Sequence, residues 1–204
     1  MLAASRLKLQ RLAEETAVLT RHIARYDKAI AEIYAQHPDA ALFDSLPGSG
    51  PVFAPRLAAV MGEERGAYES ASALQSRTGI APIRRQSGKK NLTVRRTACP
   101  RFDRQTFHEW AGESIPKSAW AKAFYESQIA AGKLHHTALR ALAFKWQRIL
   151  WRCWQDGVPY DEARYEAALA AKGSPLVAKI AEIKASQKQN GKTEPAQENP
   201  AAKM

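Results

Sequence analysis

The first 37 residues carry an apolar stripe whose spacing alternates between three and four residues, which predicts one long helix. The stripe consists of Leu9, Leu12, Thr16, Leu19, Ile23, Tyr26, Ile30 and Ile33. Thr16 is its weak position. A narrow seam of more than three heptads is typical of a coiled coil, so we expect a partner helix from this chain or another subunit. The alternative is a single amphipathic helix docked on its own domain.

The fold class predicted for the whole chain is mainly α, with a coiled-coil helix over 1–38 and a compact helical domain over 39–172. Helices are expected over 39–46, 51–61, 71–77, 106–111, 119–131, 134–154 and 160–172, with 134–154 the strongest of them. Ser70 is a candidate N-cap for the helix over 71–77. Residues 81–97 mix turn-forming and β-branched residues, which predicts a loop or a short hairpin. Residues 173–204 predict a flexible tail, because the sequence from Ala185 is polar, interrupted by Pro and Gly, and aperiodic.

The run LPGSGP, from Leu46 to Pro51, predicts a tight turn between two short helices. Gly48 and Gly50 permit positive φ and the close approach of another backbone. Free N–H groups at the start of the next helix can bind phosphate oxygens. The run therefore indicates either a helix-hairpin-helix that grips the DNA backbone or an ordinary turn between helices. Pro55 removes one backbone donor inside the second helix.

The net charge of +11 and the sequence pI of about 9.8 indicate a polyanionic partner. An anionic membrane surface would satisfy the same charge, but no window has the apolar length of a spanning helix. The N-terminus acquires acidic residues early and does not resemble a secretory signal. Cys99 and Cys153 are isolated, which suits a reducing cytoplasm.

The basic charge concentrates in residues 84–104, where eight cations face one acid, Asp103. The cations are Arg84, Arg85, Lys89, Lys90, Arg95, Arg96, Arg101 and Arg104. Ser87 lies among the first four and precedes Gly88. One interpretation is a solvated basic loop that only contacts phosphates. The other is that Ser87 attacks a phosphodiester while the cations stabilise the transition state. The residues alone favour the first, since no orienting base is visible near Ser87.

A later helix, predicted over 134–154, has an apolar side typical of a core and a basic side without acids. The basic side comprises Lys133, Arg140, Lys145, Arg148 and Arg152. It predicts contact with a nucleic-acid backbone or a solvated face. Trp151 and Trp154 could stack on bases, although packing is more typical near a helix end. No metal site is predicted, because His108, His135 and His136 lack further ligands at suitable spacing.

Four motifs in a fixed order resemble the C-terminal half of insertion-sequence transposases related to the Piv-type DNA invertases, some guided by a bridge RNA. They are PGSGP, TGIAPIRRQSGKK, RRTACPRFDRQTFHEWA and HHTALRALAFKWQRILWRCWQDGVPYDEARY. The resemblance covers roughly residues 40–169. It implies a helix-hairpin-helix at Gly48 and Gly50, a serine that bonds covalently to DNA at Ser87, and a coiled coil in the first 37 residues.

In that family a RuvC-like domain with metal-binding acids precedes these motifs, and nothing in this chain matches it. The resemblance therefore implies that a divalent metal belongs to that missing domain, with no cofactor in this chain. We expect a truncated, split or isolated portion of a transposase that binds DNA but does not cut it alone. The cations expected to hold DNA are Arg84, Arg85, Lys89, Lys90, Arg95 and Arg96.

The expected partners are DNA, a bridge RNA if this member uses one, and further copies through the coiled coil. The expected location is the nucleoid of a bacterial cytoplasm, with no membrane association. One alternative is a non-catalytic nucleic-acid-binding or regulatory protein that co-assembles with full-length transposase. Another is a structural helical protein whose charge serves solubility only.

Overall fold

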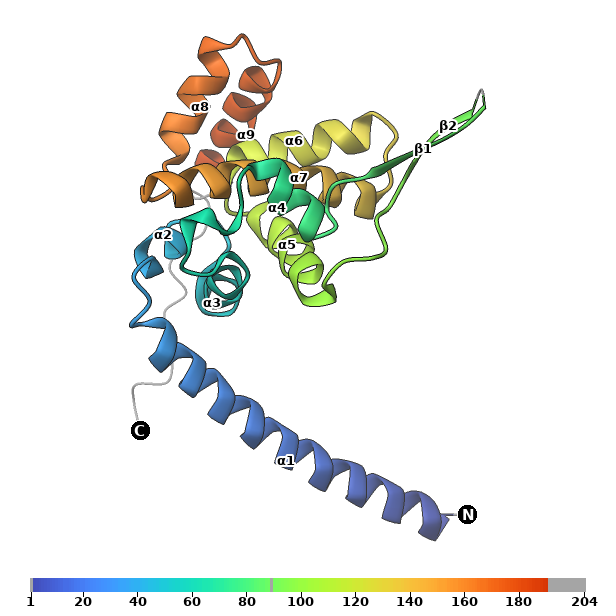
Figure 1. The fold of residues 1–204 in the computed structure, drawn as a ribbon. Coiled ribbons are helices and arrows are strands. Elements are labelled where there is room, and N and C mark those ends of the chain that lie inside the picture. The colour runs from blue at the N-terminus through green and yellow to red at the C-terminus, as the bar shows by residue number, and fades with distance from the viewer. Residues whose placement is uncertain (1, 89, 191–204) are drawn as a thin grey trace.

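The computed structural model describes residues 2–88 and 90–190 and is mainly α, as the sequence predicts (Figure 1). Its helices are α1 (Leu2–Tyr34), α2 (Ala40–Asp44), α3 (Gly50–Met61), α4 (Ala71–Arg77), α5 (Arg101–Ser114), α6 (Ala119–Ala130), α7 (His135–Asp156), α8 (Glu162–Ala171) and α9 (Leu176–Asn190), with a 3-10 turn at Arg65–Ala67. Strands β1 (Ile83–Ser87) and β2 (Lys90–Val94) pair antiparallel, so of the two alternatives expected for residues 81–97, a loop or a short hairpin, the structure has the hairpin.

The core of the helical body is centred on Trp146 of α7, which is fully buried. Its ring centroid lies 5.0 Å from that of Trp110 on α5 and 4.6 Å from that of Trp120 on α6. Its indole Nε1 donates a hydrogen bond of 2.8 Å to Ser114 Oγ. Three helices therefore converge on one residue, with its single polar atom satisfied, as a buried tryptophan requires.

Buried amides connect α4 to α7 across this core. Gln147 Nε2 donates to Thr78 Oγ1 at 2.7 Å, and Gln75 Nε2 donates to the carbonyl oxygen of Phe144 at 2.8 Å. The start of α4 is capped by Ser70, whose side chain accepts from the Ala73 amide as the sequence predicts. These bonds fix α4, and with it the start of the hairpin, on the helical body.

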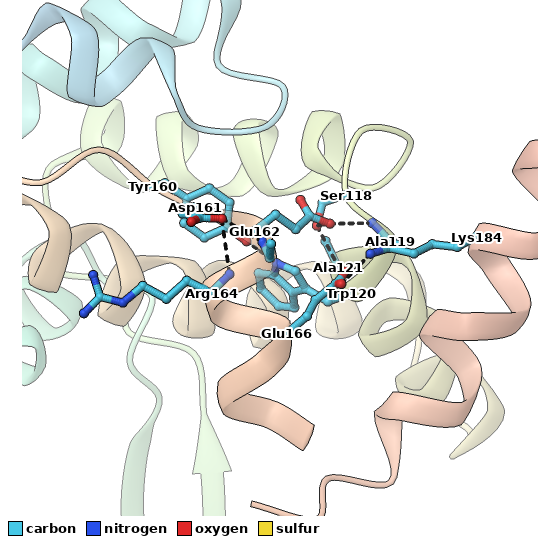
Figure 2. Close-up of polar contacts among 11 residues, drawn as sticks. Ser118, Ala119, Trp120, Ala121, Tyr160, Asp161, Glu162, Arg164, Glu166 and Lys184 are labelled. Atoms are coloured by element: carbon cyan, nitrogen blue, oxygen red, sulfur yellow. Dashed lines mark hydrogen bonds and ion pairs between the residues drawn. The ribbon is translucent and has the colours of Figure 1, made fainter. Parts of the chain in front are cut away.

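The helices α8 and α9 dock near the start of α6 through a polar network (Figure 2). Glu162 Oε1 accepts from Ser118 Oγ at 3.1 Å and from the Ala119 amide at 3.0 Å, so α8 caps the N-terminus of α6. Burial raises the pKa of the Glu162 carboxyl. An ion pair between Lys184 and Glu166 joins α9 to α8.

The structure contradicts the flexible tail expected from residue 173 as far as Asn190, because most of this segment is helical. Residues 176–190 form α9, and Ile180 and Ile183 are buried against the body. The expectation failed here because the apolar anchors Leu176, Ile180 and Ile183 span only two helical turns before the polar sequence from Ala185, which makes a weak periodic pattern. Residues 191–204, the rest of that expected tail, lie outside the described residues.

The first helix extends away from the body (Figure 1). Its seam is exposed along its length, from Leu9 at 67% to Ile33 at 73%. The body contacts its C-terminal end, where the Tyr34 hydroxyl lies 2.9 Å from Asp44 Oδ1. The alternative of an amphipathic helix docked on its own domain is therefore wrong for the described chain. Among the described helices, none combines the length and apolarity needed to cross a membrane.

Candidate nucleic-acid interface

The cationic hairpin, β1–β2 with its turn, projects from the helical body and carries Ser87 at its tip (Figure 1). Ser87 pairs with Lys90, Arg85 with Leu92, and Arg84 with Thr93. Because side chains alternate between the faces of a hairpin, Ser87, Arg85 and Lys90 share one face, and Arg84 lies on the other. The predicted cluster around Ser87 is thus divided, and Lys89 lies outside the described residues.

Ser87 is exposed, and its hydroxyl makes no hydrogen bond within the described part of the chain. Gly88, with a φ of 55°, begins the two-residue turn beside it and has open space around its Cα. A serine held this way is accessible to a phosphate. A serine hydroxyl is a weak nucleophile without a base, and none is bonded to Ser87 here.

The turn between α2 and α3 uses its two glycines for different purposes. Gly48 has a φ of 74°, and a Cβ there would lie 2.5 Å from the carbonyl oxygen of Glu113 on α5. The neighbouring Pro47 carbonyl accepts from Trp110 Nε1 at 3.0 Å. Gly48 therefore serves close packing against α5. Gly50, with a φ of 50°, has no atom near an added Cβ and is exposed.

The exposed start of α3 offers free backbone donors. Gly50 and Val52 donate no backbone hydrogen bond within the described chain, and Pro51 has no N–H. This end of the helix therefore keeps the anion-binding capacity that the sequence suggested for the turn. In Figure 1 α2 and α3 lie at the side of the body away from the cationic hairpin, so the start of α3 and the hairpin do not form one compact site.

Arg95 and Arg96 follow β2 and lie at the base of the hairpin, where they line a cavity against α6 and α7. They are therefore separated from the Ser87 tip, although the sequence groups them with it. Lys133, Arg140 and Lys145 line the same cavity. The sequence shows these three as an acid-free basic face, but it does not place that face beside Arg95.

The two tryptophans noted in the sequence pack within the fold, whereas His108 is partly buried and His135 and His136 are exposed. Trp154 is fully buried, and Trp151 Nε1 donates to the Tyr68 carbonyl at 3.1 Å. His108 Nε2 lies 3.2 Å from His136 Nδ1, and burial lowers the pKa of His108. Among residues 2–88 and 90–190, no three His, Cys, Asp or Glu side chains gather in a way that could hold a metal ion.

Comparison with known proteins places the hairpin and the α2–α3 turn inside one matched region. Residues 40–126 match the family described as Transposase IS116/IS110/IS902 family. The chain is 32% identical over 142 residues to the protein named as the mini-circle transposase for IS117 of Streptomyces coelicolor, covering 70% of this chain and 34% of that protein.

Two further relatives are proteins of insertion elements. The 42 kDa protein of IS900 from Mycobacterium paratuberculosis is 30% identical over 161 residues, which cover 78% of this chain and 40% of that protein. The 44.8 kDa protein of IS116 from Streptomyces clavuligerus is 29% identical over 148 residues, which cover 71% of this chain and 36% of that protein. The matched region spans between a third and two fifths of the length of each relative.

Proposed function

We propose that this chain, whose residues 40–126 carry an IS116/IS110/IS902 family transposase domain, is a DNA-binding portion of a transposase that acts in DNA transposition. One observation carries the proposal. The segment richest in cations forms an exposed hairpin, and Arg84, Arg85 and Lys90 there make no ion pair within the described residues. Unpaired cations on a projecting hairpin suit a nucleic-acid backbone, because binding releases the counterions condensed on the phosphates.

Ser87 is the residue that we propose reacts with DNA. Its Oγ attacks a backbone phosphorus, a new P–O bond to serine forms, and the bond to one deoxyribose oxygen breaks. Arg85 and Lys90 share its face of the hairpin and stabilise the extra negative charge at phosphorus. A base from another part of the assembly accepts the serine proton.

In this proposal, any metal ion used in the reaction is bound by a domain other than the part of the chain that the structure describes. The resemblance implies a divalent metal in a RuvC-like domain, and the described residues of this chain contain no cluster that fits one. The chain's own contribution is to hold DNA and to present Ser87. The N–H groups of Gly50 and Val52 supply a second, sequence-independent phosphate contact at the start of α3.

An electrophoretic mobility shift at two salt concentrations tests this proposal, with duplex and branched DNA and with Ser87→Ala alongside the natural chain. We expect salt-sensitive binding that Ser87→Ala leaves unchanged. A second assay adds the full-length transposase and looks for a covalent protein–DNA adduct by denaturing electrophoresis. The adduct should form with Ser87 and disappear in Ser87→Ala. Absence of binding at low salt, or an adduct that survives Ser87→Ala, contradicts the proposal.

A regulatory role is the second candidate, and the exposed seam of α1 favours it. Every position of the seam from Leu9 to Ile33 is exposed. An apolar seam exposed along its whole length suits pairing with the same helix of a full-length transposase. Light scattering coupled to size exclusion tests this with Leu19→Asp and Ile23→Asp. Arg21→Asp, on the opposite side of the heptad, is the control. Loss of association only in the two seam variants supports the role, and monomers throughout contradict it.

A further inference from the structure

A cavity of about 550 Å³ lies where the base of the cationic hairpin meets α6 and α7. Its lining is Gly79, Ile80, Pro82, Thr93, Val94, Arg95, Arg96, Phe124, Lys133, Thr137, Arg140, Ala141, Phe144 and Lys145. Ligand pockets in proteins occupy roughly 300–1,000 Å³, so this cavity has the size of a small-molecule or nucleotide site. Thr93 and Val94 of this lining belong to β2, so the cavity adjoins the end of the hairpin opposite to Ser87.

The cations of this cavity are not neutralised by the described part of the chain, since no carboxylate lines it. Within the described residues, Arg140 donates to the hydroxyl of Thr137 at 3.1 Å. Burial together with the charge of Arg95 lowers the pKa of Arg140. Burial and the neighbouring charge of Arg148 lower the pKa of Lys145. Gathering like charges costs free energy that an anion would recover.

Five cationic side chains surround the cavity, namely those of Arg95, Arg96, Lys133, Arg140 and Lys145. Arg96 Nε makes no hydrogen bond within the described chain, but it is shielded from solvent and therefore does not face the open cavity. It is therefore the five charges lining the cavity that indicate an anionic ligand.

The other part of the lining is apolar and includes two aromatic rings, Phe124 and Phe144. The Lys145 ammonium lies 4.6 Å from the centroid of the Phe124 ring, so charge and aromatic surface adjoin. Inorganic phosphate alone would leave this apolar surface uncovered. A nucleotide carries an anionic phosphate next to a planar base, which matches both parts of the lining.

We propose that this cavity binds one unpaired nucleotide of the bound DNA, with the phosphate among the cations and the base against Phe124 and Phe144. The proposal rests on the DNA-binding function proposed above and adds a site to it. A base can reach such a cavity only when it leaves the stack, which costs least where the base is already unpaired. The chain therefore prefers DNA that contains an extruded nucleotide.

Fluorescence anisotropy measures this preference with three labelled DNAs. They are a short duplex, the same duplex with one extra unpaired thymidine, and that duplex with an abasic residue at the extra position. We expect the thymidine bulge to bind about tenfold more tightly than the plain duplex, the size of one base–aromatic stack. The abasic bulge should lose most of that gain.

Two kinds of variant locate the preference in the cavity. Ala141→Phe fills it without changing charge, and Arg140→Gln with Lys145→Gln removes two of its cations. Both should abolish the bulge preference. Lys117→Gln with Lys172→Gln removes the same charge from exposed positions outside the cavity and should preserve the preference. Thermal unfolding checks each variant, and Ala141→Leu replaces Ala141→Phe if that variant does not fold.

A natural chain that binds duplex and bulge equally overturns this inference and leaves the DNA-binding proposal standing. A bulge preference that survives in the folded Ala141 variant also overturns it. Absence of binding to all three DNAs overturns the proposed function, and the inference falls with it.

Discussion

The helical body and the cationic hairpin differ in what holds their side chains in place. In the body, Trp146 is surrounded by two tryptophans, and its only polar atom is hydrogen-bonded. In the hairpin, every side chain from Arg84 to Ser87 is exposed. Stability constrains residues where they pack, and it leaves exposed residues largely free. Packing therefore accounts for the aromatic composition of the body but not for the cationic composition of the hairpin.

The largest effect that would separate the two regions is expected from Trp146→Ala. This change leaves a large cavity at the meeting point of α5, α6 and α7 and should destabilise the chain by about 3–5 kcal/mol. Urea denaturation followed by circular dichroism measures it. Trp146→Phe is the control, which keeps a ring but loses the bond to Ser114 and should cost about 1–2 kcal/mol. Equal costs for the two variants would contradict this packing.

The same substitution at two glycines compares the regions directly. Gly48→Ala places a Cβ against the Glu113 carbonyl at a positive φ and should cost about 2–4 kcal/mol. Gly88→Ala meets only the conformational strain at a φ of 55° and should cost about 1 kcal/mol. Thermal unfolding measures both variants. A larger loss at Gly88 than at Gly48 would mean that the hairpin turn, not the body, sets stability.

Charge removal on the hairpin should change binding and leave stability unaltered. Arg84→Gln with Lys90→Gln should lower DNA affinity and reduce the slope of log affinity against log salt by about 2, one for each lost phosphate contact. Lys117→Gln with Lys172→Gln is the matched control and should have a smaller effect on that slope. Anisotropy titrations over a range of salt measure it. Identical slopes for the two double variants would argue against the hairpin as the contact.

The smallest expected effect concerns the partly buried carboxyl of Glu162. Burial raises the pKa of Glu162 above its ordinary value of 4.5, so the folded state binds its proton more tightly than the unfolded state. This contribution to stability is present below pH 4.5 and is lost as pH rises through the folded-state pKa. Glu162→Gln should not lose stability as pH rises, because the amide does not titrate. Its oxygen can still accept the hydrogen bonds from Ser118 and Ala119.

Urea midpoints of the natural chain and Glu162→Gln, measured from pH 4 to pH 8, test the sign. The difference between them should move in favour of Glu162→Gln as pH rises. Glu162→Ala is the control, because it leaves the Ala119 amide without its acceptor and should be less stable at every pH. If the difference instead moves in favour of the natural chain as pH rises, the pKa of Glu162 is lower in the folded state than in the unfolded state, which contradicts this prediction.

Sequence periodicity predicted much of the fold because helices and hairpins are local. The heptads predicted α1, and the three-four spacing around Trp146 predicted the apolar face of α7. Ser70 was recognised as a cap because its bond to Ala73 spans three residues. The helix α9 was missed, since its anchors Ile180 and Ile183 become recognisable only against the body that buries them.

The sequence by itself determined the long first helix, the helical class, the concentration of charge in residues 84–104 and the position of Ser87 beside Gly88. Each depends on residues a few positions apart, where spacing translates directly into geometry. Only the tertiary structure assigned Gly48 to packing and separated Arg95 from the hairpin tip. It also brought Arg95 beside Arg140, from segments 45 positions apart, because the way that helices pack decides which distant residues share a cavity.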